Sequence, residues 1–341
     1  MPAPTTDEPE TRADRLRRKT LRGVEILITP RLLREQIEYL RHGPAPEPDG
    51  DGSGAEAPAE PAAVEPEPEP DPIEPHFGSS PWERAAVPVT DGPGAQCNVC
   101  DWTGDRFDGP EHVEGQLCPA CGSNGRDRFL FACLIRRNDP RLGATVLETS
   151  PRMGAAYRQA MHGWFHYLCS DYDASCHVGE IQLDLQHLGL TDDSVDVIMS
   201  PHVLEHVPDT DAALAEIVRA LRPGGVLYLQ VPILQGTTAP PTEPEFHGDN
   251  TPVFWRFGFD LAPRLRAAGF AVTTLVTQPL IDVVASGLAV WPGPESPEFD
   301  TASMLAAAEV DELTALLDKR EAEQLGLWHA YQFVTFECRA S

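Results

Sequence analysis

The chain has 341 residues and a net charge of -27, with 53 acidic side chains against 26 basic ones. This balance disfavours a broad nucleic-acid-binding surface, which needs Lys and Arg to neutralise phosphates. Hydrophobic residues make up 41% of the chain, enough for a sizeable core, and the length predicts about two globular units. The sequence has no apolar run of about 18 residues and no apolar N-terminal leader, so we expect a cytoplasmic protein without a membrane span.

The first 93 residues differ in composition from the rest. Residues 1–43 are predicted to be a basic helical segment, because 11–43 contain nine Lys/Arg against four Asp/Glu. This segment could pack on the body, form a homodimer or dock another protein. Residues 44–93 are predicted to be an acidic, Pro-rich disordered linker, because 44–76 hold ten Asp/Glu, ten Pro and no Lys or Arg.

Residues 94–128 are predicted to form a zinc ribbon. They contain two C-x2-C knuckles, Cys97/Cys100 and Cys118/Cys121, separated by 17 residues. Two such knuckles supply the four thiolates of a tetrahedral site with no open position for water, so the metal is expected to be structural. Two disulfides or coincidental cysteines are the alternative. The ribbon has three Arg against six Asp/Glu, a poor surface for phosphates.

Residues 129–341 show short apolar strands alternating with helices. This alternation predicts an α/β fold, a Rossmann-like doubly wound and mostly parallel sheet with helices on both faces. A lid or insertion is expected around 234–260 and a helical insertion around 278–328. A short helix is expected from Phe129 to Arg137. The first predicted strand begins at Val146. The others are predicted at 166–170, 195–200, 226–232, 270–277 and 331–338.

Between residues 184 and 232 the chain contains SVDVIMSPHVLEHVPD and then LRPGGVLYLQVP. In order and spacing these segments resemble the class I S-adenosylmethionine-dependent methyltransferases, of the methyltransferase type 11 kind. The resemblance covers residues 97 to about 340. It implies S-adenosylmethionine as cofactor, with Asp184 and the Leu185 amide at the adenine.

The family's glycine-rich first motif corresponds to VLETSPRMG, which includes Glu148, Ser150 and Gly154. Ser150 and Arg152 stand where the family has glycines, and glycine allows a backbone to approach a ligand closely. The resemblance places Asp171, at the end of the second predicted strand, at the ribose hydroxyls. Two acids at two strand ends are stronger support for a cofactor site than the loop alone.

A subset of these methyltransferases has a CPxCGS knuckle followed by an Arg-x-Arg element. Here the knuckle at Cys118 is followed by Arg126-Asp-Arg128. Arg128 is a candidate for binding the cofactor's carboxylate, since a guanidinium can pair with a carboxylate bidentately. A surface salt bridge is the alternative.

His202, Glu205 and His206 fall at i, i+3 and i+4, so a helical turn would place them on one face. The same HxxEH pattern occurs in a class of zinc proteases, but there it lies inside a long helix. Here the motif leaves an apolar strand through Pro201 and meets Pro208 at once. The triad could supply a general base, hold a divalent metal, or shape the pocket through packing.

Residues 241–260 follow the fifth strand, where this family builds a substrate lid. His247, Trp255 and Arg256 are the predicted substrate-binding residues, because aromatic walls with a few polar groups suit a small ligand. A structural loop is the alternative.

Three functions remain open from sequence. The first is a methyltransferase acting on a small molecule. The second is an RNA or protein methyltransferase that uses the ribbon and the basic segment for recognition, which the acidity disfavours. The third is a cofactor-binding but catalytically idle scaffold, which the polar lid disfavours.

Overall fold

The computed structural model describes residues 73–78, 81–83, 94–109, 116–138, 143–173, 180–247, 250–287, 300–327 and 334–341. The basic segment 1–43, with its expected helices and docking role, lies outside these residues, as does the linker up to residue 72. One compact unit spans Glu74–Ser341. Among the described residues, no helix combines the length and apolar character that crossing a bilayer requires.

A mixed eight-stranded sheet forms the centre of this unit, in the order β11-β10-β12-β7-β6-β3-β4-β5. Its strands are β3 (Thr145–Thr149), β4 (His166–Asp171), β5 (Ile181–Gln182), β6 (Val195–Pro201), β7 (Leu221–Gln230), β10 (Phe270–Thr277), β11 (Leu313–Leu317) and β12 (Thr335–Ala340). Within this sheet β12 runs antiparallel to β10 and β7, while the remaining neighbours are parallel. The predicted α/β fold with a mostly parallel sheet is therefore confirmed.

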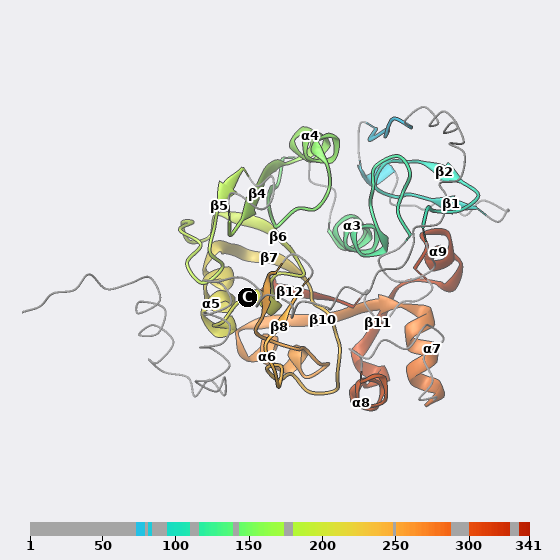
Figure 1. Cartoon of the computed structure of the whole chain (residues 1–341). Helices are drawn as coiled ribbons and strands as arrows, with labels where there is room; N and C mark the ends of the chain where they lie inside the picture. Colours follow the sequence, from blue (N-terminus) through green and yellow to red (C-terminus); the bar gives the residue numbers. More distant parts are fainter. Residues whose placement is uncertain are drawn as a thin grey trace, which may run out of the picture. The chain divides into compact units, whose positions relative to one another are not determined.

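Helices cover both faces of the sheet. Figure 1 shows α3 and α4 on one face and α5 and α6 on the other. The bounds of the helices on the two faces are α3 (Gly125–Arg137), α4 (Ala155–Trp164), α5 (Thr210–Ala220) and α6 (Leu261–Ala267). Because both faces are covered, the central strands read as continuous apolar runs, and Leu147, Ile198 and Leu227 are fully buried.

The helix after the ribbon begins earlier than expected, at Gly125 instead of Phe129. Asn124 accepts from the Asp127 backbone N–H, and the Asp127 carboxylate accepts from the Asn124 N–H. This reciprocal capping box satisfies two donors that the helix itself leaves unbonded. Arg126 and Arg128 consequently lie in the first turn of α3 and not in the ribbon.

The insertion around 278–328 is not wholly helical. It contains α7 (Gln278–Ser286), α8 (Thr301–Ala307), the 3-10 turn η3 (Val310–Glu312) and α9 (Lys319–Gln324), but also strand β11. Residues 313–317 read LTALL, which has no strong strand pattern. Pairing with the exposed edge of β10 decides their conformation, since strand formation depends on tertiary context.

Part of the expected linker packs against the body. Phe77 meets Trp164 edge-on with ring centroids 6.5 Å apart, and Trp82, in the 3-10 turn η1 (Pro81–Glu83), meets Phe165 at 5.7 Å. Burial of these aromatic side chains offsets the conformational entropy lost when the segment becomes ordered, whereas the acidic residues before it have no apolar surface to bury. Phe77 and Trp82, which fall within the predicted linker, therefore pack on the body.

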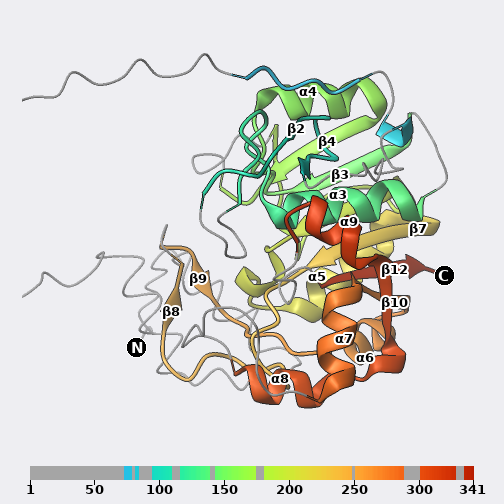
Figure 2. The same ribbon diagram turned by 90° about the vertical axis from the view of Figure 1, so that its right-hand side faces the viewer.

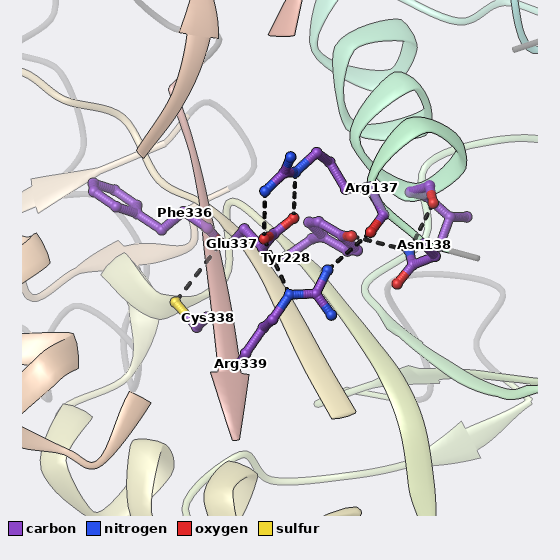
Figure 3. A network of polar contacts seen from close by, with 8 residues as sticks. Arg137, Asn138, Tyr228, Phe336, Glu337, Cys338 and Arg339 are labelled. Carbon is purple, nitrogen blue, oxygen red and sulfur yellow. Dashed lines mark hydrogen bonds and ion pairs between the residues drawn. The ribbon is translucent and has the colours of Figure 1, made fainter. Parts of the chain in front are cut away.

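A buried ion network joins α3 to the sheet. Glu337 of β12 accepts from the Arg137 Nε at 2.8 Å and Nη2 at 3.0 Å, and from the Arg339 Nε at 3.2 Å (Figure 3). Asn138, just after α3, donates to the Tyr228 hydroxyl of β7 at 2.9 Å. These contacts fix the C-terminal end of α3 on β12 and β7.

Candidate active site and metal centre

The four ribbon cysteines converge on one point. Their sulfur atoms lie within 4.8 Å of one another, with Cys97 and Cys121 3.7 Å apart and Cys100 and Cys118 3.6 Å apart. Thiolates about 2.3 Å from a central zinc ion form a tetrahedron with edges of about 3.8 Å. The cluster is therefore compatible with zinc. A short hairpin of β1 (Ala95–Gln96) and β2 (Thr103–Gly104) supports the first knuckle.

The structure gives Arg128 a different role from the one expected. Its guanidinium is fully buried and donates to the backbone carbonyls of Leu325 at 2.8 Å, Gln116 at 2.9 Å and Ser123, and it lies over the Phe107 ring. Its donors are thus committed to carbonyls of the ribbon and of the α9 region. We therefore withdraw Arg128 as a ligand of the cofactor carboxylate.

Glu148, the last residue but one of β3, is held by two hydroxyls. Its Oε2 accepts from the Tyr167 hydroxyl at 2.6 Å and from the Tyr157 hydroxyl at 3.1 Å. Burial raises the pKa of this carboxyl to about 7, against the opposing effect of the two hydrogen bonds. Glu148 therefore joins α4 to β4 beneath the loop that follows β3.

Ser150 takes the backbone conformation that a glycine would otherwise supply. Its φ is 51°, in the left-handed region, and its hydroxyl donates to Asp171 Oδ2 at 3.2 Å. Gly154, by contrast, has a φ of -64°, and a Cβ there would meet nothing within 4 Å. The loop thus has a glycine-type backbone conformation at Ser150, while the conformation at residue 154 does not require a glycine.

The two acids proposed for the cofactor lie at neighbouring strand ends. Asp171 closes β4, and its backbone carbonyl accepts from the Leu183 N–H at 2.9 Å, next to Asp184. Asp184 Oδ1 accepts from the backbone and side chain of Gln186. Leu185, whose amide is the other expected adenine contact, is buried.

The structure brings His202, Glu205 and His206 together at the carboxyl end of β6. His202 has a φ of 52°, and a 3-10 turn, η2 (Leu204–His206), follows it. His202 Nδ1 lies 3.5 Å and His206 Nε2 3.9 Å from Glu205 Oε1. Within the described residues, neither carboxyl oxygen of Glu205 nor Nε2 of His202 makes a hydrogen bond, although both side chains are buried. Buried polar atoms without partners mark a place where a ligand could supply them.

The environment of this cluster alters its titration. Burial raises the pKa of Glu205 to about 8 and lowers that of His202 well below its usual range. The positive charges of Arg126 and Arg152 also lower the pKa of His202 and oppose the rise at Glu205. Two cations therefore act on the cluster from α3 and from the loop after β3.

His206 is oriented by the segment predicted as a lid. Its Nδ1 lies 2.7 Å from the Pro252 carbonyl oxygen, which can only accept, so Nδ1 carries the proton in the neutral ring. The His247 ring stands edge-on to it, 4.7 Å between centroids. Trp255 donates from Nε1 to the Val207 carbonyl at 3.1 Å.

The segment predicted as a lid contains a small hairpin of β8 (Glu245–Phe246) and β9 (Pro252–Val253), at the edge of the sheet where β7 ends (Figure 2). Backbone N–H groups of Phe254 and Trp255 donate to the Glu205 carbonyl. Arg256 pairs with Glu245 at 2.7 Å, so it stabilises the hairpin instead of standing open to a substrate.

Among the described residues, the four cysteines are the one group of His, Cys, Asp and Glu that gathers ligand atoms at metal-binding separations. The His202 cluster does not meet that condition, which weighs against the divalent-metal interpretation. Arg126 was not among the predicted site residues, although it lies in the Arg-x-Arg element. The capping pair Asn124 and Asp127 begins α3 before both arginines, and this pattern could have placed Arg126 in the helix.

Comparison with known proteins identifies the domain. Residues 121–229 match the family model described as a methyltransferase domain. The chain is 32% identical over 120 residues to an arsenite methyltransferase of Aquipseudomonas alcaligenes, covering 35% of this chain and 33% of the relative. It is 33% identical over 122 residues to a malonyl-[acyl-carrier protein] O-methyltransferase of Serratia marcescens, covering 35% of this chain and 39% of the relative. The chain thus matches about a third of the length of these curated relatives.

Among solved structures, a 1,6-didemethyltoxoflavin-N1-methyltransferase of Burkholderia thailandensis aligns at 15% identity with a TM-score of 0.34, covering 59% of this chain and 72% of that one. The family match includes the end of the second knuckle, the loop after β3, the His202 cluster and β7 up to Leu229. The sequence-based resemblance to a methyltransferase domain is confirmed over residues 121–229.

Proposed function

We propose that the protein transfers a methyl group from S-adenosylmethionine to a small molecule and that the four-cysteine ribbon holds a structural zinc ion. The observation that carries the proposal is the buried polar cluster of His202, Glu205 and His206. It lies at the carboxyl end of β6 and is covered by the β8–β9 hairpin. In open parallel sheets, ligands bind beyond the carboxyl ends of the strands.

The cofactor contacts follow from the strand ends. Asp171 binds the ribose hydroxyls, while Asp184 and the Leu185 amide bind the adenine. Glu148 lies near the end of β3, and Ser150 and Gly154 belong to the loop that follows it, where Ser150 orients Asp171.

Arg126 replaces Arg128 as the residue that binds the cofactor's carboxylate. It is buried in the first turn of α3, and its charge acts on His202 and Glu205. A guanidinium pairs with a carboxylate through two parallel hydrogen bonds.

The bound cofactor supplies an electrophilic methyl group on a sulfonium. When bound, it would offer that methyl group to a lone pair of the acceptor, and the side chains of this chain would orient the acceptor and take its proton. His206 takes the acceptor's proton at Nε2, because Nδ1 already donates to the Pro252 carbonyl. Glu205 Oε1 lies 3.9 Å from His206 Nε2, and a carboxylate at that position favours the charged imidazolium.

The lid favours a small acceptor. His247 and Trp255 provide aromatic surface beside His206, while Arg256 holds the hairpin through Glu245. Backbone bonds from Phe254 and Trp255 to the Glu205 carbonyl hold the segment after the hairpin against η2, and small-molecule sites combine aromatic surface with a few polar groups in this way. The acidic ribbon offers little to an RNA.

Incubation with methyl-labelled cofactor and a cell extract, fractionated into macromolecules and small molecules, tests the proposal. We expect label in the small-molecule fraction and about a hundredfold less with His206→Ala. His162→Ala, on the exposed His162–Glu180 pair, is the matched control and should transfer normally. Label confined to RNA or protein would contradict the small-molecule assignment. Cofactor binding without transfer to any fraction would support the idle scaffold instead.

A further inference from the structure

The metal centre is continuous with the start of α3. Ser123 follows the second knuckle directly, and its hydroxyl lies 3.3 Å from Cys97 Sγ and 3.2 Å from Cys121 Sγ. Its backbone carbonyl accepts from the Cys118 N–H at 2.8 Å. The next residue, Asn124, caps the helix. The last cysteine is thus only a few residues from the first turn of α3, with no flexible connection between them.

The first knuckle holds the same turn from the other side. Asn98, between Cys97 and Cys100, donates from its buried amide to the Arg128 carbonyl at 2.9 Å. The Arg128 guanidinium in turn joins carbonyls of Gln116, Ser123 and Leu325. Arg128 therefore joins both sides of the ribbon to the segment after α9. Figure 1 shows β1 and β2 of the ribbon beside α9.

This turn carries Arg126 to the edge of the sheet where the reaction site lies. Arg126 is 4% exposed, and its carbonyl accepts from the Gln230 side chain at the end of β7. It contributes positive charge to a place where Arg152 contributes a second. In a chain of net charge -27, a buried guanidinium at this edge of the sheet favours an anionic ligand group.

We propose that the four-cysteine metal site positions Arg126 for the carboxylate of the cofactor, with Arg128 as the positioning residue, so that metal occupancy sets cofactor affinity. This inference rests on the proposed function, because it assumes that the cofactor binds at this edge. The ribbon is then a part of the cofactor site and not a module for recognising a macromolecule.

Calorimetry with S-adenosylhomocysteine on the full chain tests the coupling. The metal-loaded protein, whose zinc content is measured, is compared with protein stripped by a chelator and with Arg126→Gln in both states. We expect stripping and Arg126→Gln each to weaken binding about tenfold or more, through loss of charge-assisted hydrogen bonds. Removing zinc from the Arg126→Gln protein should weaken binding by less than about a further twofold, because the interaction between Arg126 and the ligand's carboxylate is already lost.

Methylthioadenosine, which lacks the carboxylate, is the control ligand. Its affinity should be unchanged by removal of zinc and by Arg128→Lys. The affinity for S-adenosylhomocysteine should fall in both cases. Re-addition of zinc should restore the tighter binding, which separates positioning from irreversible unfolding. Three results would overturn the coupling. These are an equal loss of affinity for both ligands, independent losses from zinc removal and Arg126→Gln that multiply in the combined protein, or no loss of affinity when zinc is removed. Failure of the metal-loaded protein to bind either ligand would instead contradict the proposed function.

Discussion

Ser150 donates from its hydroxyl to Asp171 Oδ2 over 3.2 Å, and this bond joins the loop after β3 to the carboxyl end of β4. Asp171 Oδ1 accepts from the Asp173 N–H at 3.2 Å, so both oxygens of the carboxylate are oriented before any ligand binds. Such preorganisation lowers the entropy lost on binding. A serine thus does two things here: it makes the turn and it orients the acid.

Substitutions of Ser150 separate these two contributions. Ser150→Ala keeps the left-handed backbone at a φ of 51° and removes the hydrogen bond, so we expect the free energy of unfolding to fall by about 1 kcal/mol. Ser150→Gly removes the same bond but relieves the strain, and should be more stable than Ser150→Ala by about 1 kcal/mol. Urea unfolding measures both. Equal stability of the two variants would argue against strain at this position.

Glu205 should make stability depend on pH. Its pKa is raised to about 8 in the folded protein, above the ordinary value of 4.5, because the carboxyl is buried. The stability associated with its protonated form is complete below about pH 4.5 and is lost as the pH rises toward 8. Glu205→Gln should therefore gain stability relative to the wild type by up to a few kcal/mol between pH 5 and pH 8.5. A difference that stays constant across this range would contradict the burial of an ionisable group there.

The ion network of Figure 3 should contribute to stability through Glu337. Glu337→Gln leaves two arginine side chains facing a neutral group, and we expect a loss of about 1–3 kcal/mol, moderated by the partial exposure of both arginines. Glu312→Gln is the control, since its pair with Arg266 is exposed and should contribute less than about 1 kcal/mol. Thermal unfolding of both variants should rank them in that order; the reverse order would show that the buried carboxylate is not the stronger partner.

Two truncations locate the start of the folded unit. Deleting residues 1–72 should leave cofactor affinity and stability unchanged, because the compact unit begins at Glu74. Deleting residues 1–83 also removes Phe77 and Trp82, and should lower the free energy of unfolding by about 1–3 kcal/mol. If the two proteins unfold alike, the aromatic contacts do not stabilise the body.

Local patterns were sufficient for the central fold. The strands at 145–149, 166–171 and 270–277 are apolar runs bounded by turns and helices, and each lies where the sequence predicts it. The ribbon was equally readable, because knuckle spacing alone limits how four thiols can meet. Strand β11 was missed, since its conformation depends on the edge of β10 and not on its own residues.

The site was readable only in part. Spacing predicted that His202, Glu205 and His206 would meet, but not the left-handed backbone at His202 or the carbonyl of Pro252 that fixes the proton on His206. Arg128 and Arg126 cannot be distinguished in sequence, because the choice depends on which one faces the carbonyls of Gln116 and Leu325. These contacts cross long stretches of chain, and local patterns carry no information about them.

Calorimetric titration of the full chain with S-adenosylhomocysteine, in the wild type and in Asp171→Ala and Asp184→Ala, tests the central claim most directly. We expect one ligand per wild-type chain and a weakening of about tenfold to a hundredfold in each variant, because the ribose or adenine donors lose their partner. Absence of binding to the wild type, or unchanged affinity in both variants, would contradict the placement of the cofactor between the ends of β4 and β5.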